Sequence, residues 1–161
     1  MKKLLLFLLF LIPTNLYSAE GILKKEFEVN ASYDKTLKWV EENQKLIRKT
    51  MGLEVLQDLG NGKLKVKKET SKGTFVWILQ EKIEKKDNLY KYKSSLVQSL
   101  EGGMIASDTE IIIKPFKNKT NIFMKVGAKI QETDEIGDFE VRFDINMHTN
   151  KVKKLLEHQL K

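Results

Sequence analysis

The sequence predicts an α+β domain in which an antiparallel sheet of about seven strands packs against a C-terminal helix. Residues 53–131 alternate apolar and polar side chains between turn residues that recur about every 10 to 15 positions, a pattern typical of an antiparallel meander. Residues 33–51 and 138–160 instead carry apolar side chains at three- and four-residue steps, which predicts helices. A sheet with one apolar face needs a cover, and residues 138–160 are the long candidate near the C-terminus.

A strand and a pair of short helices are expected before the meander. Residues 22–29 alternate as a first strand. Ser32 can cap a helix that begins at the next residue, and Gly52 follows the helical pattern, as expected for a left-handed glycine at a helix end. We expect a break near Asn43, which would give two short helices at an angle.

Six strands should follow the helix pair. Their expected ranges are 53–59, 63–70, 74–83, 89–100, 104–114 and 121–131. The strand over 74–83 is the most apolar, with Phe75 and Trp77 on the same face. In the strand over 104–114, the alternation predicts that Ile105 and Thr109 share a face.

Two interpretations of Phe139–Met147 remain open. A helical face is formed by Val141, Ile145, His148, Val152, Leu155 and Leu156, and Asp138 can serve as its N-cap. The same stretch also alternates strictly, with β-branched and aromatic side chains, which favours a strand. We prefer one helix throughout.

Three stretches and the closing helix carry a family resemblance. In residues 27–40, a strand ends in Asn-Ala-Ser before a helix that bears an aromatic residue. Residues 53–62 form the hairpin after the helix pair. Residues 96–104 read Leu-Val-Gln-Ser-Leu-Glu-Gly-Gly-Met. This order resembles the START-like or Bet v 1-like superfamily (SRPBCC) of polyketide cyclases and lipid-transfer proteins, which have the helix-grip fold. The resemblance implies one domain over residues 20–161, a curved sheet wrapped around the C-terminal helix, and a hydrophobic cavity between them.

The resemblance also implies that side chains on the inner face of the sheet and on the helix line this cavity. The candidates are Phe75, Trp77, Tyr92, Ser94, Thr109, Ile111, Met124, Val126, Val141, Ile145 and His148. Ser94, Thr109 and His148 are the polar members, which could orient a ligand. The aromatic side chains fit an ordinary packed core equally well, since aromatic faces build both cores and pockets.

The residue inventory argues against several kinds of active site. The chain has no cysteine, and its two histidines, His148 and His158, would lie about 15 Å apart along a helix, so neither a transition-metal site nor a cofactor is expected. No nucleophile elbow, phosphate loop or dinucleotide fingerprint occurs, and we assign no catalytic residue. Asp108, Glu110 and His148 are the nearest acid–base candidates, but strand parity places both acids outward.

The N-terminus has the pattern of a cleaved secretory signal peptide, residues 1–19. Lys2 and Lys3 precede an apolar run over residues 4–12, and the small residues Ser18 and Ala19 follow. The run is too short to span a bilayer, which needs about 20 apolar residues. A lipid anchor is excluded because that processing needs a cysteine. We therefore expect a periplasmic or secreted protein, with cleavage after Ser18 or Ala19.

The charge pattern favours a small-molecule partner over nucleic acid. The formal net charge is +7, but the basic residues are dispersed lysines, and Arg48 and Arg142 are the only arginines. Such a surface is compatible with transient contact with anionic membranes. The leading hypothesis is an exported, monomeric binding protein that encloses a lipid or another hydrophobic small molecule. The alternatives are a cyclase-, aromatase- or hydratase-type enzyme, and an interaction module with a filled core.

Overall fold

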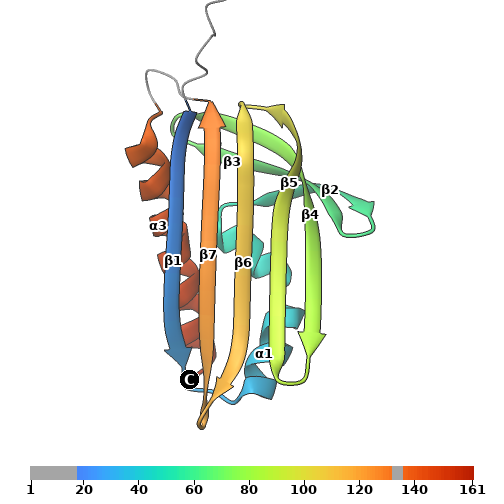
Figure 1. Cartoon of the computed structure of the whole chain (residues 1–161), viewed down its shortest axis with the longest axis vertical. Coiled ribbons are helices and arrows are strands. Elements are labelled where there is room, and N and C mark those ends of the chain that lie inside the picture. The colour runs from blue at the N-terminus through green and yellow to red at the C-terminus, as the bar shows by residue number, and fades with distance from the viewer. Residues whose placement is uncertain (1–17, 132–135) are drawn as a thin grey trace, which may run out of the picture.

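The computed structural model describes residues 18–131 and 136–161 (Figure 1). Its elements are β1 (Ser18–Val29), α1 (Tyr33–Glu42), α2 (Gln44–Thr50), β2 (Glu54–Gly60), β3 (Lys63–Thr70), β4 (Gly73–Lys86), β5 (Leu89–Glu101), β6 (Met104–Phe116), β7 (Lys119–Gln131) and α3 (Asp138–Gln159). This is the predicted order of a strand, a helix pair, six strands and a helix. None of the helices in the described ranges is long and apolar enough to cross a membrane.

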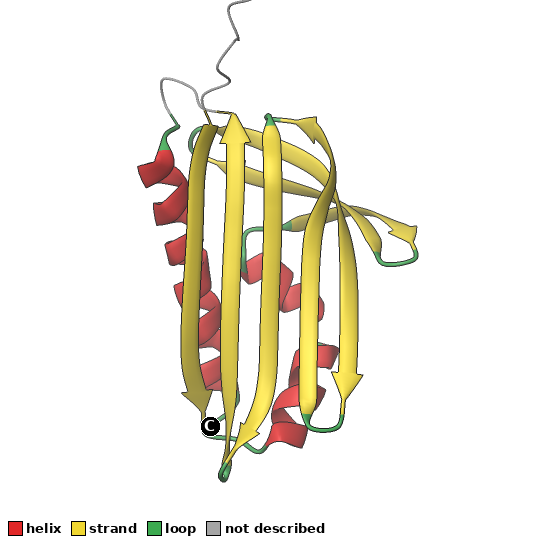
Figure 2. Cartoon of the chain, viewed as in Figure 1, coloured by secondary structure: helices red, strands yellow, loops and turns green. Residues whose placement is uncertain are grey.

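The strands form one open antiparallel sheet in the order β1-β7-β6-β5-β4-β3-β2. All three helices lie on one face of it, with α3 running along β1 and β7 (Figures 1 and 2). Gly21 on β1 permits this close packing, because a Cβ there would come within 3.0 Å of the backbone nitrogen of Arg142. The predicted helix-grip architecture is therefore confirmed.

Local signals position the helix pair as expected. The backbone N–H of Lys35 donates to Ser32 Oγ at 3.4 Å, so Ser32 is the N-cap of α1. Asn43 separates α1 from α2. Gly52 adopts φ +78° after α2, and the backbone N–H groups of Gly52 and Leu53 bond to carbonyls in the last turn of the helix. This is the glycine-terminated helix end that the sequence predicted.

The stretch Phe139–Met147 is helical throughout, so the strand interpretation is wrong. The buried side of α3 is formed by Val141, Ile145, Thr149, Val152 and Leu156, which a helical period brings together. The predicted N-cap is also corrected. Gly137 occupies that position, and Asp138 is the first helical residue, where its Oδ1 accepts the backbone N–H of Glu20 on β1 at 2.6 Å.

An irregularity at the start of β6 changes which side chains face inward. The register with β7 shifts between Met104 and Ala106. Met104 is consequently buried, while Ile105 is 45% exposed, so the prediction that Ile105 shares a face with Thr109 is wrong. An extra residue at a bulge inverts the alternation on one side of it, which simple parity cannot anticipate.

The first strand includes the last two residues of the predicted signal peptide. Ser18 pairs with Gln131, and Ala19 pairs with Ile130 and is buried. Residues 1–17, the rest of that prediction, lie outside the described residues.

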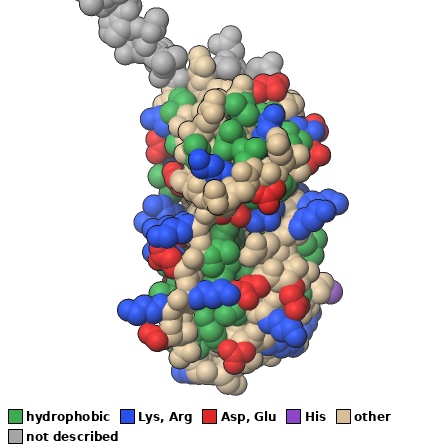
Figure 3. All heavy atoms as spheres, turned by 90° about the vertical axis from the view of Figure 1, so that its right-hand side faces the viewer, with side chains coloured by type: hydrophobic (Ala, Val, Ile, Leu, Met, Phe, Trp, Pro, Cys, Tyr) green, Lys and Arg blue, Asp and Glu red, His purple; other side chains and the backbone are tan. Residues whose placement is uncertain are grey.

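The interior contains two apolar clusters at opposite ends of the sheet. One joins α1, α2 and the C-terminal half of α3 to the sheet, through residues such as Phe27, Ile47, Met124 and Leu156. The other lies between the N-terminal half of α3 and strands β3, β4, β6 and β7. On the outside, basic and acidic side chains are interspersed on the face shown in Figure 3.

Candidate ligand-binding cavity

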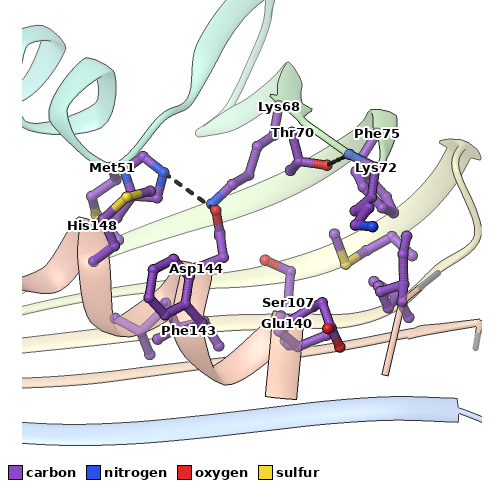
Figure 4. A pocket seen from close by; sticks show the side chains of 18 of the residues that line it. Met51, Lys68, Thr70, Lys72, Phe75, Ser107, Glu140, Phe143, Asp144 and His148 are labelled. Carbon is purple, nitrogen blue, oxygen red and sulfur yellow. Dashed lines mark hydrogen bonds and ion pairs between the residues drawn. The ribbon is translucent and has the colours of Figure 1, made fainter. Parts of the chain in front are cut away.

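A cavity of about 600 Å³ lies between the sheet and the N-terminal half of α3. Its sheet wall includes Phe75 and Trp77 on β4, Met104 on β6 and Val126 on β7. Across the space, α3 contributes Val141, Phe143 and Ile145, and the segment after α2 contributes Met51 and Leu53 (Figure 4). The cavity has the size and the apolar walls of a small-molecule site.

Exposed aromatic side chains of α3 line the open side of the cavity. Phe139 is 74% exposed and Phe143 is 60% exposed, and their rings stack with centroids 6.2 Å apart. Met147 lies one further turn along the same stripe and also lines the cavity. Because this stretch is helical, its apolar residues fall on two faces of α3. One face, which includes Val141, is packed against the protein, and the other borders the opening of the cavity.

The structure places many of the predicted lining residues at this cavity. They are Phe75, Trp77, Thr109, Val126, Val141, Ile145 and His148. Each of these side chains points inward, as the period of its strand or helix predicted. Each also lies toward the end of the sheet that α1 and α2 do not cover.

Four predicted lining residues lie elsewhere, which corrects their assignment to the cavity. Met124 is buried in the cluster under α1 and α2, and Tyr92 and Ile111 pack against that cluster. Ser94 is buried and borders a hollow of about 370 Å³ that opens on the outer face of the sheet. Met124, Tyr92 and Ile111 occupy inward positions, but α1 and α2 fill the interior at their end of the sheet.

Sequence reasoning missed several lining residues. Met104 on β6 escaped because the bulge inverts the alternation at the start of that strand, and Ser107, which lies in step with Thr109, was not selected. The rim provided by the β3–β4 hairpin, residues 68–72, was treated as a simple turn. Its proximity to α3 depends on how β3 and β4 fold back over the helix, which no local pattern encodes.

A polar chain at the cavity edge ties α3 to β3 and to α2. Lys68 Nζ lies 2.5 Å from Asp144 Oδ2, and His148 Nε2 lies 3.4 Å from Asp144 Oδ1 (Figure 4). His148 Nδ1 lies 3.0 Å from the carbonyl oxygen of Thr50, at the end of α2. Gly52 leaves room for this imidazole, because a Cβ there would lie 2.8 Å from His148 Cε1.

Asp144 is held in its ionised form by these partners. Burial on its own would raise the pKa of Asp144. The hydrogen bond with His148 and the charge of Lys68 outweigh burial and keep the pKa below its usual value. The carboxylate therefore serves as the acceptor that joins a strand and two helices.

A second buried polar cluster joins α2 to the sheet. Arg48 donates from Nε and Nη2 to the two carboxylate oxygens of Glu81 on β4, at 2.8 and 2.7 Å. Tyr92 donates its hydroxyl to Glu81 Oε1 at 2.7 Å. Burial, followed by the charge of Glu81, raises the pKa of Tyr92, so its hydroxyl remains a donor. The sequence held no signal for this long-range contact.

The acid–base candidates are not gathered in the cavity. Asp108 and Glu110 border the outer hollow, and Glu110 pairs with Lys91 at 2.9 Å. Among the three candidates, His148 alone lines the cavity, and both of its ring nitrogens face acceptor atoms of the protein. In the part of the chain that the structure describes, His, Asp and Glu side chains form no group suited to a metal ion.

No protein-family model and no curated protein sequence matches the chain. Solved structures do match it over most of its length. A START superfamily protein from Mycobacterium smegmatis aligns with a TM-score of 0.62 at 15% identity, covering 86% of this chain and 96% of that one.

Two further solved structures are similar. The Zhui aromatase/cyclase from Streptomyces sp. R1128 aligns with a TM-score of 0.58 at 10% identity, covering 88% of this chain and 97% of that one. Ara h 8.0201 aligns with a TM-score of 0.55 at 16% identity, covering 88% of this chain and 98% of that one. The sheet order, the helix pair and the closing helix, together with these alignments, show that the chain has the START-like, or Bet v 1-like, helix-grip fold.

Proposed function

We propose that this protein binds an apolar small molecule or lipid and encloses it between the sheet and α3. The observation that carries the proposal is the cavity of about 600 Å³ with apolar walls. Protein interiors are normally close-packed, and an unfilled apolar space forfeits the contacts of its lining atoms. A ligand would restore those contacts, and burial of its apolar surface would supply roughly 25 cal/mol per Å².

The opening of the cavity supports uptake of an apolar ligand. Phe139 and Phe143 offer an apolar surface beside the cavity, where side chains of a soluble protein are usually polar. A ligand carried in a membrane or on another protein could pass over these rings without full exposure to water. Transient contact with an anionic membrane surface is part of this proposal, as the net positive charge favours it.

The similar structures support the proposal by analogy of fold only. They include a START superfamily protein and an aromatase/cyclase, so the same architecture serves in proteins of different kinds. A binding role is favoured here over an enzyme because the cavity collects apolar side chains and its one histidine is engaged with the protein. An interaction module with a filled core is disfavoured by the cavity itself.

The proposal places the protein in the periplasm or outside the cell, as a monomer. The support is the signal-peptide pattern of residues 1–19. Fractionation of cells that express the full chain, followed by N-terminal sequencing of the exported form, tests the location. An uncleaved cytoplasmic protein would contradict it.

Native mass spectrometry of the purified protein, followed by organic extraction, tests for a bound ligand directly. A titration with 1-anilinonaphthalene-8-sulfonate and with a fluorescent fatty acid tests the cavity. We expect Val126→Phe, which fills part of the cavity, to weaken probe binding about tenfold or more. The matched control Ile22→Phe enlarges a side chain that is 55% exposed on β1, and should leave binding unchanged. Absence of probe binding to the unmodified protein, or equal binding by both variants, would refute the proposal.

A further inference from the structure

The polar side chains that line the cavity fall into two groups. Most of those at its rim are already bonded within the protein, and the rim also includes Ser71 and Lys72. The contacts are Lys68 with Asp144, Asp144 with His148, His148 with the Thr50 carbonyl, Glu69 with Lys67 at 3.0 Å, Glu140 with the Gly137 N–H at 3.0 Å, and the Thr70 hydroxyl with the Gly73 carbonyl at 3.1 Å. The bonded rim groups therefore have partners within the protein before a ligand enters the cavity.

Two hydroxyls inside the cavity differ from the rim. Ser107 and Thr109 occupy successive inward positions on β6, and both are partly buried in the lining. Their register partners on β7 are Ala128 and Val126, whose side chains cannot form hydrogen bonds, and on β5 Thr109 pairs with Ser94. Neither hydroxyl forms a hydrogen bond with any residue in the ranges 18–131 and 136–161. Figure 4 shows the Ser107 side chain directed from β6 into the space facing α3.

The surroundings of these two hydroxyls would let them discriminate between ligands with and without a polar group. The walls next to them are mainly apolar: Met104 and Val126 lie on the sheet side, and Val141 and Ile145 on the helix side. Trp77 also lines the cavity, and its buried indole N–H has no hydrogen-bond partner among the described residues. A pure hydrocarbon that filled the cavity would displace water from Ser107 and Thr109 and leave both hydroxyls without a partner, which is unfavourable. A ligand oxygen at that place would accept their hydrogen bonds and remove the penalty.

We propose that the ligand is an apolar molecule that carries a hydroxyl or carbonyl oxygen, and that Ser107 and Thr109 on β6 bind that oxygen inside the cavity. The inference rests on the proposed binding function and names the chemical class of the ligand. Ser107 and Thr109 are thus specificity-determining residues: they select oxygen-bearing compounds over hydrocarbons of the same shape.

Naphthalene and 2-naphthol form a matched pair of probes, because they share one ring system and differ by a hydroxyl. Their affinities are measured by displacement of 1-anilinonaphthalene-8-sulfonate. We expect the protein to bind 2-naphthol about tenfold more tightly than naphthalene, as for one well-made hydrogen bond to a buried group. In the double variant Ser107→Ala, Thr109→Val this preference should disappear, while naphthalene binds at least as tightly as before.

The control is Ser95→Ala, which removes an exposed hydroxyl from the outer face of β5 and should leave the preference intact. Circular dichroism and melting curves confirm that each variant is folded. Equal affinity of the unmodified protein for the two probes, or a preference that survives in the double variant, overturns the inference and leaves the binding function standing. If neither probe binds and 1-anilinonaphthalene-8-sulfonate does not bind either, the proposed function is overturned together with the inference.

Discussion

Gly52 provides a test of how α3 is held against α2. Its φ of +78° is unfavourable for a residue with a Cβ, which costs about 1 kcal/mol. In addition, the Cβ of an alanine would lie 2.8 Å from His148 Cε1 and 3.0 Å from Nε2. The imidazole would have to move away from the Thr50 carbonyl and from Asp144, at a further cost of about 1–2 kcal/mol. We therefore expect Gly52→Ala to lower the free energy of unfolding by roughly 2–3 kcal/mol.

Gly60 is a matched control for this experiment. Its φ is +79°, but a Cβ there would meet nothing within 4 Å. Gly60→Ala should therefore cost only the backbone term, about 1 kcal/mol. Urea denaturation measures both variants, and unchanged m-values would show that the native and unfolded states stay comparable.

A double-mutant cycle isolates the contribution of His148. In a His148→Ala background, Gly52→Ala should cost no more than Gly60→Ala, so the coupling between positions 52 and 148 should be about 1–2 kcal/mol. Equal costs for the two glycine substitutions in the unmodified background, or a coupling below about 0.5 kcal/mol, would refute the view that the imidazole sits against Gly52 and anchors α3.

Three further predictions concern the buried polar groups. Burial opposes ionisation of Asp144, but His148 and Lys68 lower its pKa. The stabilisation that the ionised Asp144 gives the fold is therefore present above the unfolded pKa of about 3.9 and is lost as pH falls through the folded pKa. The difference in stability between the unmodified protein and Asp144→Asn should shrink toward pH 2, as followed by circular dichroism. Burial, with the charges of Glu41 and Glu81, raises the pKa of Tyr90 to about 12. The contribution of this shift to folding stability is complete below about pH 10 and is lost as pH rises toward 12. Between pH 9 and pH 11, the stability of Tyr90→Phe should therefore fall less than that of the unmodified protein, in the same assay. Glu81→Gln leaves the buried guanidinium of Arg48 without its carboxylate and should cost about 3 kcal/mol, whereas Glu54→Gln at an exposed ion pair should cost under about 0.5 kcal/mol in urea melts.

Local features of the chain were predictable because their causes are local. Ser32 caps α1, and Gly52 ends α2, through contacts with residues only a few positions away. The alternation in β4 correctly turned Phe75 and Trp77 toward the interior. Family resemblance then predicted how these elements would be arranged, and the sheet order confirms it.

The candidate site was predictable only in part, because periodicity says which side of an element faces inward and nothing about what lies opposite. Met124 and Val126 are two residues apart on the same face of β7, yet Met124 is packed beneath the helix pair and Val126 lines the cavity. Met104 was missed because one irregular residue in β6 inverted the pattern at the start of the strand. The same limitation hid the contact between Arg48 and Glu81, which are far apart in the sequence.

The sequence by itself determined the order of elements, the ends of α1 and α2 and the inward faces of the regular parts of the strands, since each depends on side chains that are neighbours along the chain. It left two conformations open for Phe139–Met147, because both periods fit the same residues. Only the tertiary structure decided between them, and it decided which end of the interior is filled and which is open. The physical reason is that α1 and α2 cover one end of the sheet, while α3 and the β3–β4 hairpin meet over the other, and these long-range contacts leave the cavity between them.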